Sequence, residues 1–444
     1  MKLLIKNGRV IDPENNIDQI RDILAEDGKI AKVAQNIRNG ADKVIDATGK
    51  IVMPGLVDMH VHLREPGRED KETIYSGTRA ALKGGVTSVL AMPNTSPAID
   101  TAENIKLLKC IIKKTAQANV FIAAAITKGR LGQELTEIAR LQKEGAIAIT
   151  DDGASVDNAQ LMQEALKLAK KENILVICHS EDRSLSARGV VNLGLTSTRL
   201  GLRGISRESE YKRVERDIRL AEQAQAPVHI AHVSCQESIE IIAAAKKRGA
   251  RVTCDTAPHY FSLSEEAVLG YDTNFKMNPP LRSADDVVAL KQGLKNGVID
   301  AIASDHAPHT ENEKDIEFER AEFGVVGLET ELVVAITELV DTGLLDWLGL
   351  AQKMALNPAK ILGLSKGTLG QGSDADIIII DPAQEWRVEK PDLISKSKNS
   401  AFLGKRLKGQ VEYAILGGKI ASKNENSRHP RTGKISQVAE NLRA

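Results

Sequence analysis

The chain has 444 residues, more than one ordinary small domain holds, and this length suits a large barrel with a smaller domain beside it. Its 60 basic and 60 acidic residues balance, and aromatic residues make up only 3%, so neither charge nor base stacking favours a nucleic-acid partner. Hydrophobic residues make up 42%, enough for a substantial core, yet no stretch approaches the length of a membrane span.

The first residues, MKLLIKNGRVIDPENN, contain an apolar run that is too short for a signal peptide. The four cysteines, Cys110, Cys178, Cys235 and Cys254, lie far apart and match neither a disulfide framework nor a zinc finger. We therefore expect a reduced, cytoplasmic protein without a membrane segment. Residues 1–53 then form short apolar stretches separated by turns, such as KLLIKNGRVID and KVIDATGKIVMPG, which predict β-strands.

Residues 54–366 alternate short apolar runs with amphipathic helical stretches, such as AENIKLLKCIIKKTAQ and AQLMQEALKLAKKE. Eight runs are predicted to be strands: Gly55–His62, Thr87–Pro93, Val120–Thr127, Ala146–Asp152, Ile174–Ser180, Pro227–Ser234, Arg251–His259 and Val298–His306. Eight strand–helix units favour a closed (β/α)₈ barrel of the TIM type over an open α/β sheet.

Residues 367–420 return to strands and turns, as in SDADIIIIDP and VEYAILGGKI. Neither terminal region alone has enough apolar surface for a stable core, so we expect 1–53 and 367–420 to form one small composite β-sandwich beside the barrel. Residues 421–444 form a polar tail, whose last dozen residues could make a short helix and to which we assign no function.

Eight of the nine histidines lie at or just beyond the predicted barrel strands, and only His429 lies in the tail. His60 and His62 are two residues apart, so both point to the same side of a strand. Four more residues of metal-ligand type end later strands: Asp152, His179, His232 and Asp305. Because the C-terminal ends of barrel strands converge on one face, these six predict a site for zinc or a similar ion, in which a carboxylate can bridge two metals.

The remaining candidates have plainer interpretations. His229 should point away from the site, into the strand, and serve a structural role. Asp151 is expected to form a turn or to support the ligands. For His259 and His306, two interpretations stay open: a hydrogen-bonding role near the site, or a structural role. The cysteines are expected to be small core side chains. Cys235 alone is a candidate for a role near the site, because it follows the proposed ligand His232 closely.

Several motifs together resemble the class I dihydroorotases of the amidohydrolase superfamily, from the first barrel strand to about Ile420. They are DMHVHLREPG (58–67), AMPNTSP (91–97), TDDG (150–153), CHSED (178–182), AHVSCQES (231–238), KMNPPLR (276–282) and SDHAPHT (304–310), followed by FGVVGLET and NPAKILGL. The resemblance implies that the six residues above are metal ligands, that Asp305 is also the general acid–base, and that further positions hold substrate: Arg64, Asn94, Asn278, His309 and the backbone around Phe323 and Gly324.

One position separates this family from similar hydantoinases and dihydropyrimidinases, which usually carry a carboxylated lysine at the end of the fourth strand. Here that strand reads AIAITDD, Lys143 lies before it, and Asp152 takes the bridging position. Two departures from the family pattern are Glu322 and Ser206, where proline is common. Neither is a proposed ligand, although Glu322 could alter the stiffness of the preceding loop.

The resemblance implies reversible cyclisation of N-carbamoyl-L-aspartate to (S)-dihydroorotate in de novo pyrimidine (UMP) biosynthesis, with one or two Zn²⁺ activating the water and Asp152 bridging two ions. It further implies a homodimer, and association with aspartate carbamoyltransferase stays open. Arg64 suits the carboxylate of that substrate. The charged segment from His309 to Gly324 is interpreted as a mobile lid, with a plain solvated loop as the alternative.

Two rival functions stay open. One is a related cyclic amidohydrolase that acts on a hydantoin, a dihydropyrimidine or allantoin. The other is a non-catalytic dihydroorotase-like partner of aspartate carbamoyltransferase, which would be expected to have lost metal ligands.

Overall fold

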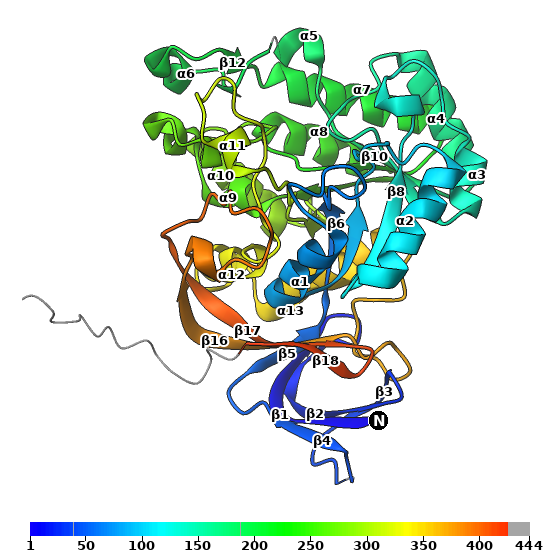
Figure 1. The fold of residues 1–444 in the computed structure, drawn as a ribbon, viewed down its shortest axis with the longest axis vertical. Coiled ribbons are helices and arrows are strands. Elements are labelled where there is room, and N and C mark those ends of the chain that lie inside the picture. The colour runs from blue at the N-terminus through cyan, green and yellow to red at the C-terminus, as the bar shows by residue number, and fades with distance from the viewer. Residues whose placement is uncertain (39, 187, 425–444) are drawn as a thin grey trace, which may run out of the picture.

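The computed structural model describes residues 1–38, 40–186 and 188–424, so the predicted tail helix lies outside the described residues. A barrel surrounded by helices sits on a smaller β domain, in which strands from the two ends of the chain lie side by side (Figure 1). Within the described ranges, no helix combines the length and apolar character that a membrane span requires.

All eight predicted barrel strands are present. They are β6 (Leu56–Val61), β7 (Val86–Ala91), β8 (Asn119–Ala124), β9 (Ala146–Ile149), β10 (Leu175–Cys178), β13 (Val228–Ile230), β14 (Val252–Thr256) and β15 (Ala301–Ile302). They pair in chain order from β6 to β15. A parallel bridge between Val61 and His306, with the N–H of His62 donating to the carbonyl of His306 at 2.9 Å, joins the last strand to the first. This closure confirms the TIM-type barrel.

The strands are shorter than the sequence patterns suggested, because the chain turns away before the residues of the site. His232 follows the end of β13 by two positions and has φ 40°, and Asp305 follows β15 by three and has φ 48°. Positive φ is uncommon outside glycine and is found where the surrounding structure fixes a functional side chain. The site residues therefore sit largely in loops that a rigid barrel holds in place.

Amphipathic helices cover the barrel. The main ones are α1 (Ile74–Gly84), α2 (Ala102–Thr115), α3 (Ile138–Lys143), α4 (Ala159–Lys171), α7 (Glu208–Ala224), α8 (Gln236–Lys247), α10 (Ala284–Lys295), α12 (Glu331–Ala335) and α13 (Trp347–Ala351). Residues 183–186 and 188–205 contribute a small insertion with α5 (Arg183–Ser186), β11 (Val191–Asn192), α6 (Leu195–Leu200) and β12 (Gly204–Ile205). In α2, Ala102, Ile105 and Leu108 recur every three residues on the buried face. The predicted helical stretches are thus confirmed.

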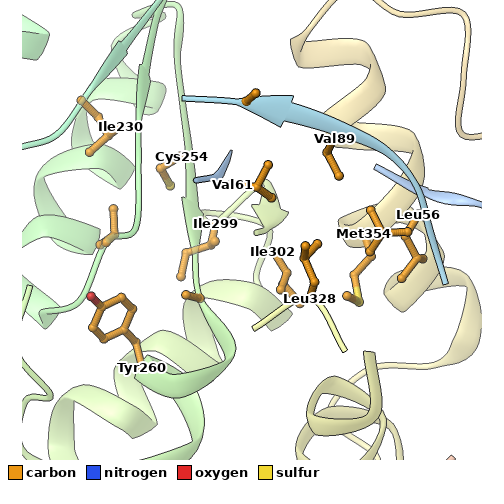
Figure 2. Packing of buried hydrophobic residues seen from close by; sticks show 14 of the residues in the cluster. Leu56, Val61, Val89, Ile230, Cys254, Tyr260, Ile299, Ile302, Leu328 and Met354 are labelled. Atoms are coloured by element: carbon orange, nitrogen blue, oxygen red, sulfur yellow. The ribbon is translucent and has the colours of Figure 1, made fainter. Parts of the chain in front are cut away.

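The main core fills the space between the barrel strands and the helices around them. Val61 and Val89 from the first strands belong to the same buried cluster as Ile302 from the last strand (Figure 2). Leu328 and Met354, from the segment after the barrel, pack into this cluster too. Burial of such side chains contributes about 1.5–3 kcal/mol each, so the C-terminal helices help to hold the barrel closed.

The β domain contains strands from both termini, as expected: β1 (Lys2–Asp12), β2 (Ile17–Glu26), β3 (Lys29–Ala34), β4 (Lys43–Asp46), β5 (Ile51–Pro54), β16 (Ile377–Arg387), β17 (Arg406–Leu416) and β18 (Lys419–Lys423). The strand order is β18-β17-β16-β5-β1-β2-β3, with β4 also paired to β1. Leu3, Ile23, Ile377 and Ile415 share one buried cluster, so the two ends bury each other's apolar faces. β18 extends three residues past the expected boundary at 420.

Candidate active site at the C-terminal face of the barrel

The six predicted metal ligands lie close together at the C-terminal ends of the barrel strands. His60 belongs to β6 and His62 follows it, whereas the other four stand in the loops after β9, β10, β13 and β15: Asp152, His179, His232 and Asp305. All six are buried. The barrel therefore gathers residues that are up to 245 positions apart in the sequence.

The first half of the cluster joins two histidines to two carboxylates. Nε2 of His60 lies 3.2 Å from Oδ1 of Asp152 and 3.6 Å from Oδ1 of Asp305. Nε2 of His62 lies 3.3 Å from the same oxygen of Asp305 and 3.5 Å from Oδ2 of Asp152. Both imidazoles thus present Nε2 to the same pair of carboxylates.

The other two histidines approach the same oxygen of Asp152 as His60 does. Nδ1 of His179 and Nε2 of His232 are 2.9 Å apart, and each lies 3.5 Å from Oδ1 of Asp152. The two oxygens of Asp152 therefore face all four histidines. Oδ1 of Asp152 faces His60, His179 and His232, and Oδ2 faces His62.

The donor atoms fit a divalent cation. Two triads, His60–Asp152–His232 and His60–His62–Asp305, each have ligand atoms within 4.8 Å of one another. Nε2 of His60 and Oδ1 of Asp152 are buried and make no hydrogen bond. Buried polar atoms are costly without a partner, and imidazole nitrogens with carboxylate oxygens are the ligands that zinc prefers.

Opposite charges dominate the electrostatics of the cluster. Burial alone would lower the pKa of His60, but the charges of Asp152 and Asp305 raise it to about 10. Burial would raise the pKa of Asp305, but contact with His62 and the charge of His60 hold it below its usual range. Asp305 is therefore an ionised carboxylate.

Glu181, which sequence reasoning missed, orients His179. Its Oε2 lies 3.4 Å from Nε2 of His179 and accepts a hydrogen bond of 3.1 Å from Nδ2 of Asn278. This contact leaves Nδ1 of His179 to face Asp152, and it brings Asn278, a predicted substrate residue, to the edge of the cluster. The position of Glu181 in CHSED, two residues after a proposed ligand, was the only signal in the sequence.

Two further carboxylates fix the backbone beside the ligands. Oδ1 of Asp255 accepts from the N–H of His232 at 2.7 Å, and Oδ2 lies 2.9 Å from Nε2 of His229. Asp58 accepts from the N–H of His60 at 3.0 Å and from the Ser304 hydroxyl. His229 has the structural role expected of it, but its imidazole does not point away from the site, because it contacts the carboxylate of Asp255 that holds the N–H of His232.

The predicted substrate residues line one side of the cluster. Oδ1 of Asn94 lies 2.8 Å from Nδ1 of His62, so this side chain also orients a proposed ligand. Nε of Arg64 donates to the carbonyl of Pro308 at 3.1 Å, and Nη2 lies 3.2 Å from Nε2 of His309. Arg64 adopts a left-handed conformation, with φ 62°. The pair Arg64–His309 offers an anion-binding corner beside the cluster.

Gly324 lies against this corner, although its backbone groups are already engaged. Its N–H donates to the carbonyl of Lys276 at 2.9 Å, and its carbonyl accepts from Lys314 and Asn399, each at 3.1 Å. The ring of Phe323 lies 4.5 Å from Nζ of Lys276. A substrate that binds the backbone of this segment must therefore either displace the hydrogen bonds of Gly324 or contact the backbone of Phe323 instead.

The charged segment after β15 is anchored at both ends in this conformation. It contains the short helix α11 (Glu311–Lys314), whose buried Lys314 donates to the carbonyl of Glu322 at 2.9 Å. Phe318 is buried. His309 also lines a cavity of about 560 Å³ between this segment and residues 390–399.

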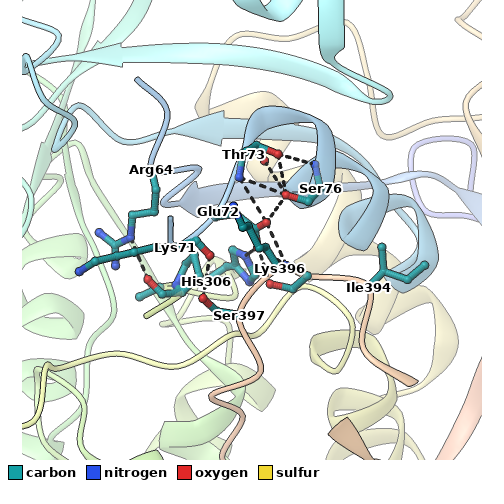
Figure 3. A network of polar contacts seen from close by, with 12 residues as sticks. Arg64, Lys71, Glu72, Thr73, Ser76, His306, Ile394, Lys396 and Ser397 are labelled. Atoms are coloured by element: carbon teal, nitrogen blue, oxygen red, sulfur yellow. Dashed lines mark hydrogen bonds and ion pairs between the residues drawn. The ribbon is translucent and has the colours of Figure 1, made fainter. Parts of the chain in front are cut away.

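The other candidates serve as supports or core residues. Asp151 accepts from the N–H groups of Ile126 and Thr127 at 2.8 and 3.0 Å, which ties the loops after β8 and β9 together. His306 contacts Glu72 at 3.4 Å, and the N–H of Lys396 donates to the same carboxylate at 3.1 Å, within a polar network beside Arg64 and Lys71 (Figure 3).

Cys235 and His259 are buried and belong to neither metal-binding triad of the described residues. Lys143 is exposed in α3, before β9 and away from the bridging position of Asp152.

Comparison with known proteins identifies the family of this chain. A family model described as dihydro-orotase-like matches residues 49–238. The dihydroorotase of Elusimicrobium minutum is 55% identical over 96% of this chain and 98% of its own length. That of Geobacter metallireducens is 52% identical over 95% of this chain and 100% of its own.

Solved structures with the same fold include hydantoinases. The L-hydantoinase (dihydropyrimidinase) from Arthrobacter aurescens has a TM-score of 0.87 and 26% identity, with 95% of this chain and 96% of that chain covered. The dihydropyrimidinase from Brevibacillus agri has a TM-score of 0.85 at 23% identity, covering 96% and 95%, and this likeness shows the fold alone. The identity to the two dihydroorotases, 55% and 52% over nearly the whole chain, is about twice the identity to these hydantoinase structures. The chain therefore belongs to the dihydroorotase family.

Proposed function

We propose that this chain catalyses the reversible cyclisation of N-carbamoyl-L-aspartate to (S)-dihydroorotate, a step of de novo pyrimidine (UMP) biosynthesis. The observation that carries the proposal is the Arg64–His309 corner beside the histidine–carboxylate cluster. A cyclic amide that bears a carboxylate can place its amide at the cluster and its carboxylate at the corner. A guanidinium pairs with such a carboxylate through two charge-assisted hydrogen bonds. Asn94, Asn278 and the backbone of the Phe323–Gly324 segment would complete the substrate site.

The cluster would hold two Zn²⁺ ions. His60, His62 and Asp305 would bind one, His179 and His232 the other, and Asp152 would bridge them, since each of the four imidazoles lies within 3.5 Å of an Asp152 oxygen. When bound, such an ion polarises the amide carbonyl and lowers the pKa of its bound water far below the bulk value, to about 7.

Asp305 would move the protons. In ring opening its carboxylate accepts a proton from the attacking water and delivers it to the leaving ring nitrogen. In cyclisation it removes a proton from the carbamoyl nitrogen as that nitrogen attacks the side-chain carboxyl group, and it gives this proton to the carboxyl oxygen whose C–O bond breaks and which leaves as water. His62, 3.3 Å from Oδ1 of Asp305, keeps this carboxylate in place and ionised.

The test is the absorbance change on adding dihydroorotate to zinc-loaded protein, with Asp305→Ala measured beside the wild type. Ring opening by the wild type and a loss of at least about 10³-fold in kcat with a smaller change in KM for the variant would support the proposal. A folded, zinc-loaded wild type that leaves dihydroorotate intact would overturn it.

Hydantoin or dihydropyrimidine hydrolysis is the second candidate, because the hydantoinase structures share the fold. Asp152 in place of a carboxylated lysine and the anion-binding corner both favour dihydroorotate. Cleavage of hydantoin or dihydrouracil, without cleavage of dihydroorotate, would move the assignment to this candidate.

The proposal also includes a cytoplasmic homodimer and leaves room for association with aspartate carbamoyltransferase. Light scattering coupled to size-exclusion chromatography, alone and with that enzyme added, tests both assemblies.

A further inference from the structure

Lys71 is a buried lysine beside the substrate corner to which neither the sequence motifs nor the proposed mechanism assigns a role. It lies in the loop between β6 and α1 and is only 4% exposed. Its Nζ is 3.1 Å from Nδ1 of His309 and 2.9 Å from Oε1 of Glu313 in α11. In Figure 3 the side chains of Lys71 and Arg64 reach toward the same place.

The imidazole of His309 therefore lies between two cationic side chains. Nδ1 faces Lys71 at 3.1 Å and Nε2 faces Arg64 at 3.2 Å. Burial and the charges of these neighbours lower the pKa of His309 to about 2, so the ring is neutral. A neutral imidazole has one lone pair and one N–H, whereas guanidinium and ammonium groups only donate. Both cations thus compete for a single acceptor.

The surroundings favour the hydrogen bond from Lys71 to Nδ1 over the one from Arg64 to Nε2. Its amino group is buried against the carboxylate of Glu313, so its donors need acceptors close by. Arg64 is less buried and already donates to the carbonyl of Pro308 through Nε. Lys71 accordingly takes the lone pair of Nδ1, which leaves the proton of His309 on Nε2.

We propose that Lys71 is a positioning residue that sets the tautomer of His309, so that Nε2–H and Arg64 form a two-donor cradle for the carboxylate of the substrate. In the absence of an anion, two N–H donors then face each other across 3.2 Å. An incoming carboxylate oxygen accepts from both and removes this conflict. The inference rests on the proposed function, because it takes dihydroorotate as the source of the carboxylate.

The competing arrangement puts the proton on Nδ1. Oε2 of Glu313 lies 3.6 Å from Nδ1 and could accept it after a small shift, while Arg64 would donate to Nε2. In that arrangement His309 has no proton to give to a carboxylate. The two arrangements differ in which ring nitrogen carries hydrogen, which ¹⁵N chemical shifts distinguish directly.

The first experiment is ¹⁵N-histidine NMR of the full-length, zinc-loaded protein, with the His309 signals assigned from their loss in His309→Asn. We expect the hydrogen on Nε2 in the wild type, and a shift toward the Nδ1–H form in Lys71→Met. Succinate serves as a carboxylate probe and should shift the Nε2 signal. Hydrogen on Nδ1 in the wild type would overturn the proposal, whether or not the protein turns over dihydroorotate.

The second experiment is steady-state kinetics with dihydroorotate. Losing a charge-assisted hydrogen bond to the substrate should raise KM by about tenfold or more in Lys71→Met, while kcat stays within about threefold. Lys71→Arg, which keeps a donor, should recover most of the loss.

Lys353→Met is the matched control for these kinetics. Lys353 is 6% exposed, and its Nζ donates to the carbonyl of Ile299, at the N-terminal side of β15. Removing this buried ammonium tests for a general effect of lost stability and should leave KM unchanged. An unchanged KM in Lys71→Met, or an equal rise in Lys353→Met, would overturn the proposal. If the wild type lacks turnover altogether, the proposed function fails, and the NMR result still decides the tautomer.

Discussion

Gly324 faces the imidazole of His309 so closely that a β-carbon on this glycine would lie 3.3 Å from Nε2. The same β-carbon would lie 2.6 Å from Cβ of Ala307, and the glycine has φ 123°. This position therefore tolerates neither the volume nor the backbone preference of another residue.

Gly324→Ala is expected to lower kcat/KM for dihydroorotate by at least about tenfold and to destabilise the protein by about 1–3 kcal/mol. Kinetics and urea unfolding measure the two effects. Gly372→Ala is the control, since Gly372 also has positive φ, 88°, but nothing within 4 Å of its β-carbon. Equal effects in both variants would show that backbone strain alone, without crowding of His309, explains the loss.

Glu181→Gln should weaken metal binding by about 10- to 100-fold, because the variant loses the charge that orients His179 and strengthens it as a ligand. Competition with a chromogenic zinc chelator measures the affinity. Glu215→Gln, on an exposed position of α7, serves as the control and should bind zinc like the wild type. Wild-type affinity in Glu181→Gln would contradict the role assigned to this carboxylate.

Removing metal with dipicolinate should abolish turnover and lower the melting temperature, since an ion that binds only the folded state stabilises it by about 2.7 kcal/mol at 100 times its Kd. Adding zinc back should restore both. Metal content, turnover and scanning fluorimetry follow the cycle on one sample. Full turnover at less than about 0.1 metal ion per chain would rule out a metal-dependent site at the cluster.

His259 predicts a pH dependence of stability. Its burial lowers the pKa to about 4, against about 6.5 in an unfolded chain. Between these values the unfolded chain binds the additional proton, so the free energy of unfolding falls as the pH falls from about 6.5 to about 4. His259→Phe should reduce this fall by about 1–3 kcal/mol. Urea unfolding at pH 7 and at pH 4.5 checks it, and identical pH dependences in both proteins would contradict it.

Much of the barrel could be predicted from the sequence because its signals are local. The strand–helix alternation is visible in each segment, and two histidines two residues apart, His60 and His62, must point the same way in a strand. The rule that C-terminal strand ends converge then placed Asp152 and Asp305 near them, and the structure brings them within 3.6 Å of His60.

The supporting contacts could not be predicted, because each depends on a pairing between distant segments. Glu181 meets Asn278 across 97 positions, and Lys71 meets His309 across 238. No period in the sequence encodes such a contact. The strand ends were placed too late for a related reason: the turn of the backbone at Asp305, with φ 48°, is imposed by its surroundings.

The bridge between Val61 and His306 gives the enzyme an order of assembly. His60 and His62 lie on and just after the first strand, and Asp305 stands beside the last, so the chain must be synthesised past position 306 before the ring can close. A ribosome-bound fragment that ends earlier contains most of the proposed ligands but lacks Asp305, the proposed acid–base residue. Catalysis can therefore begin only after the first and last strands of the barrel have paired, and turnover can serve as an assay for closure of the barrel.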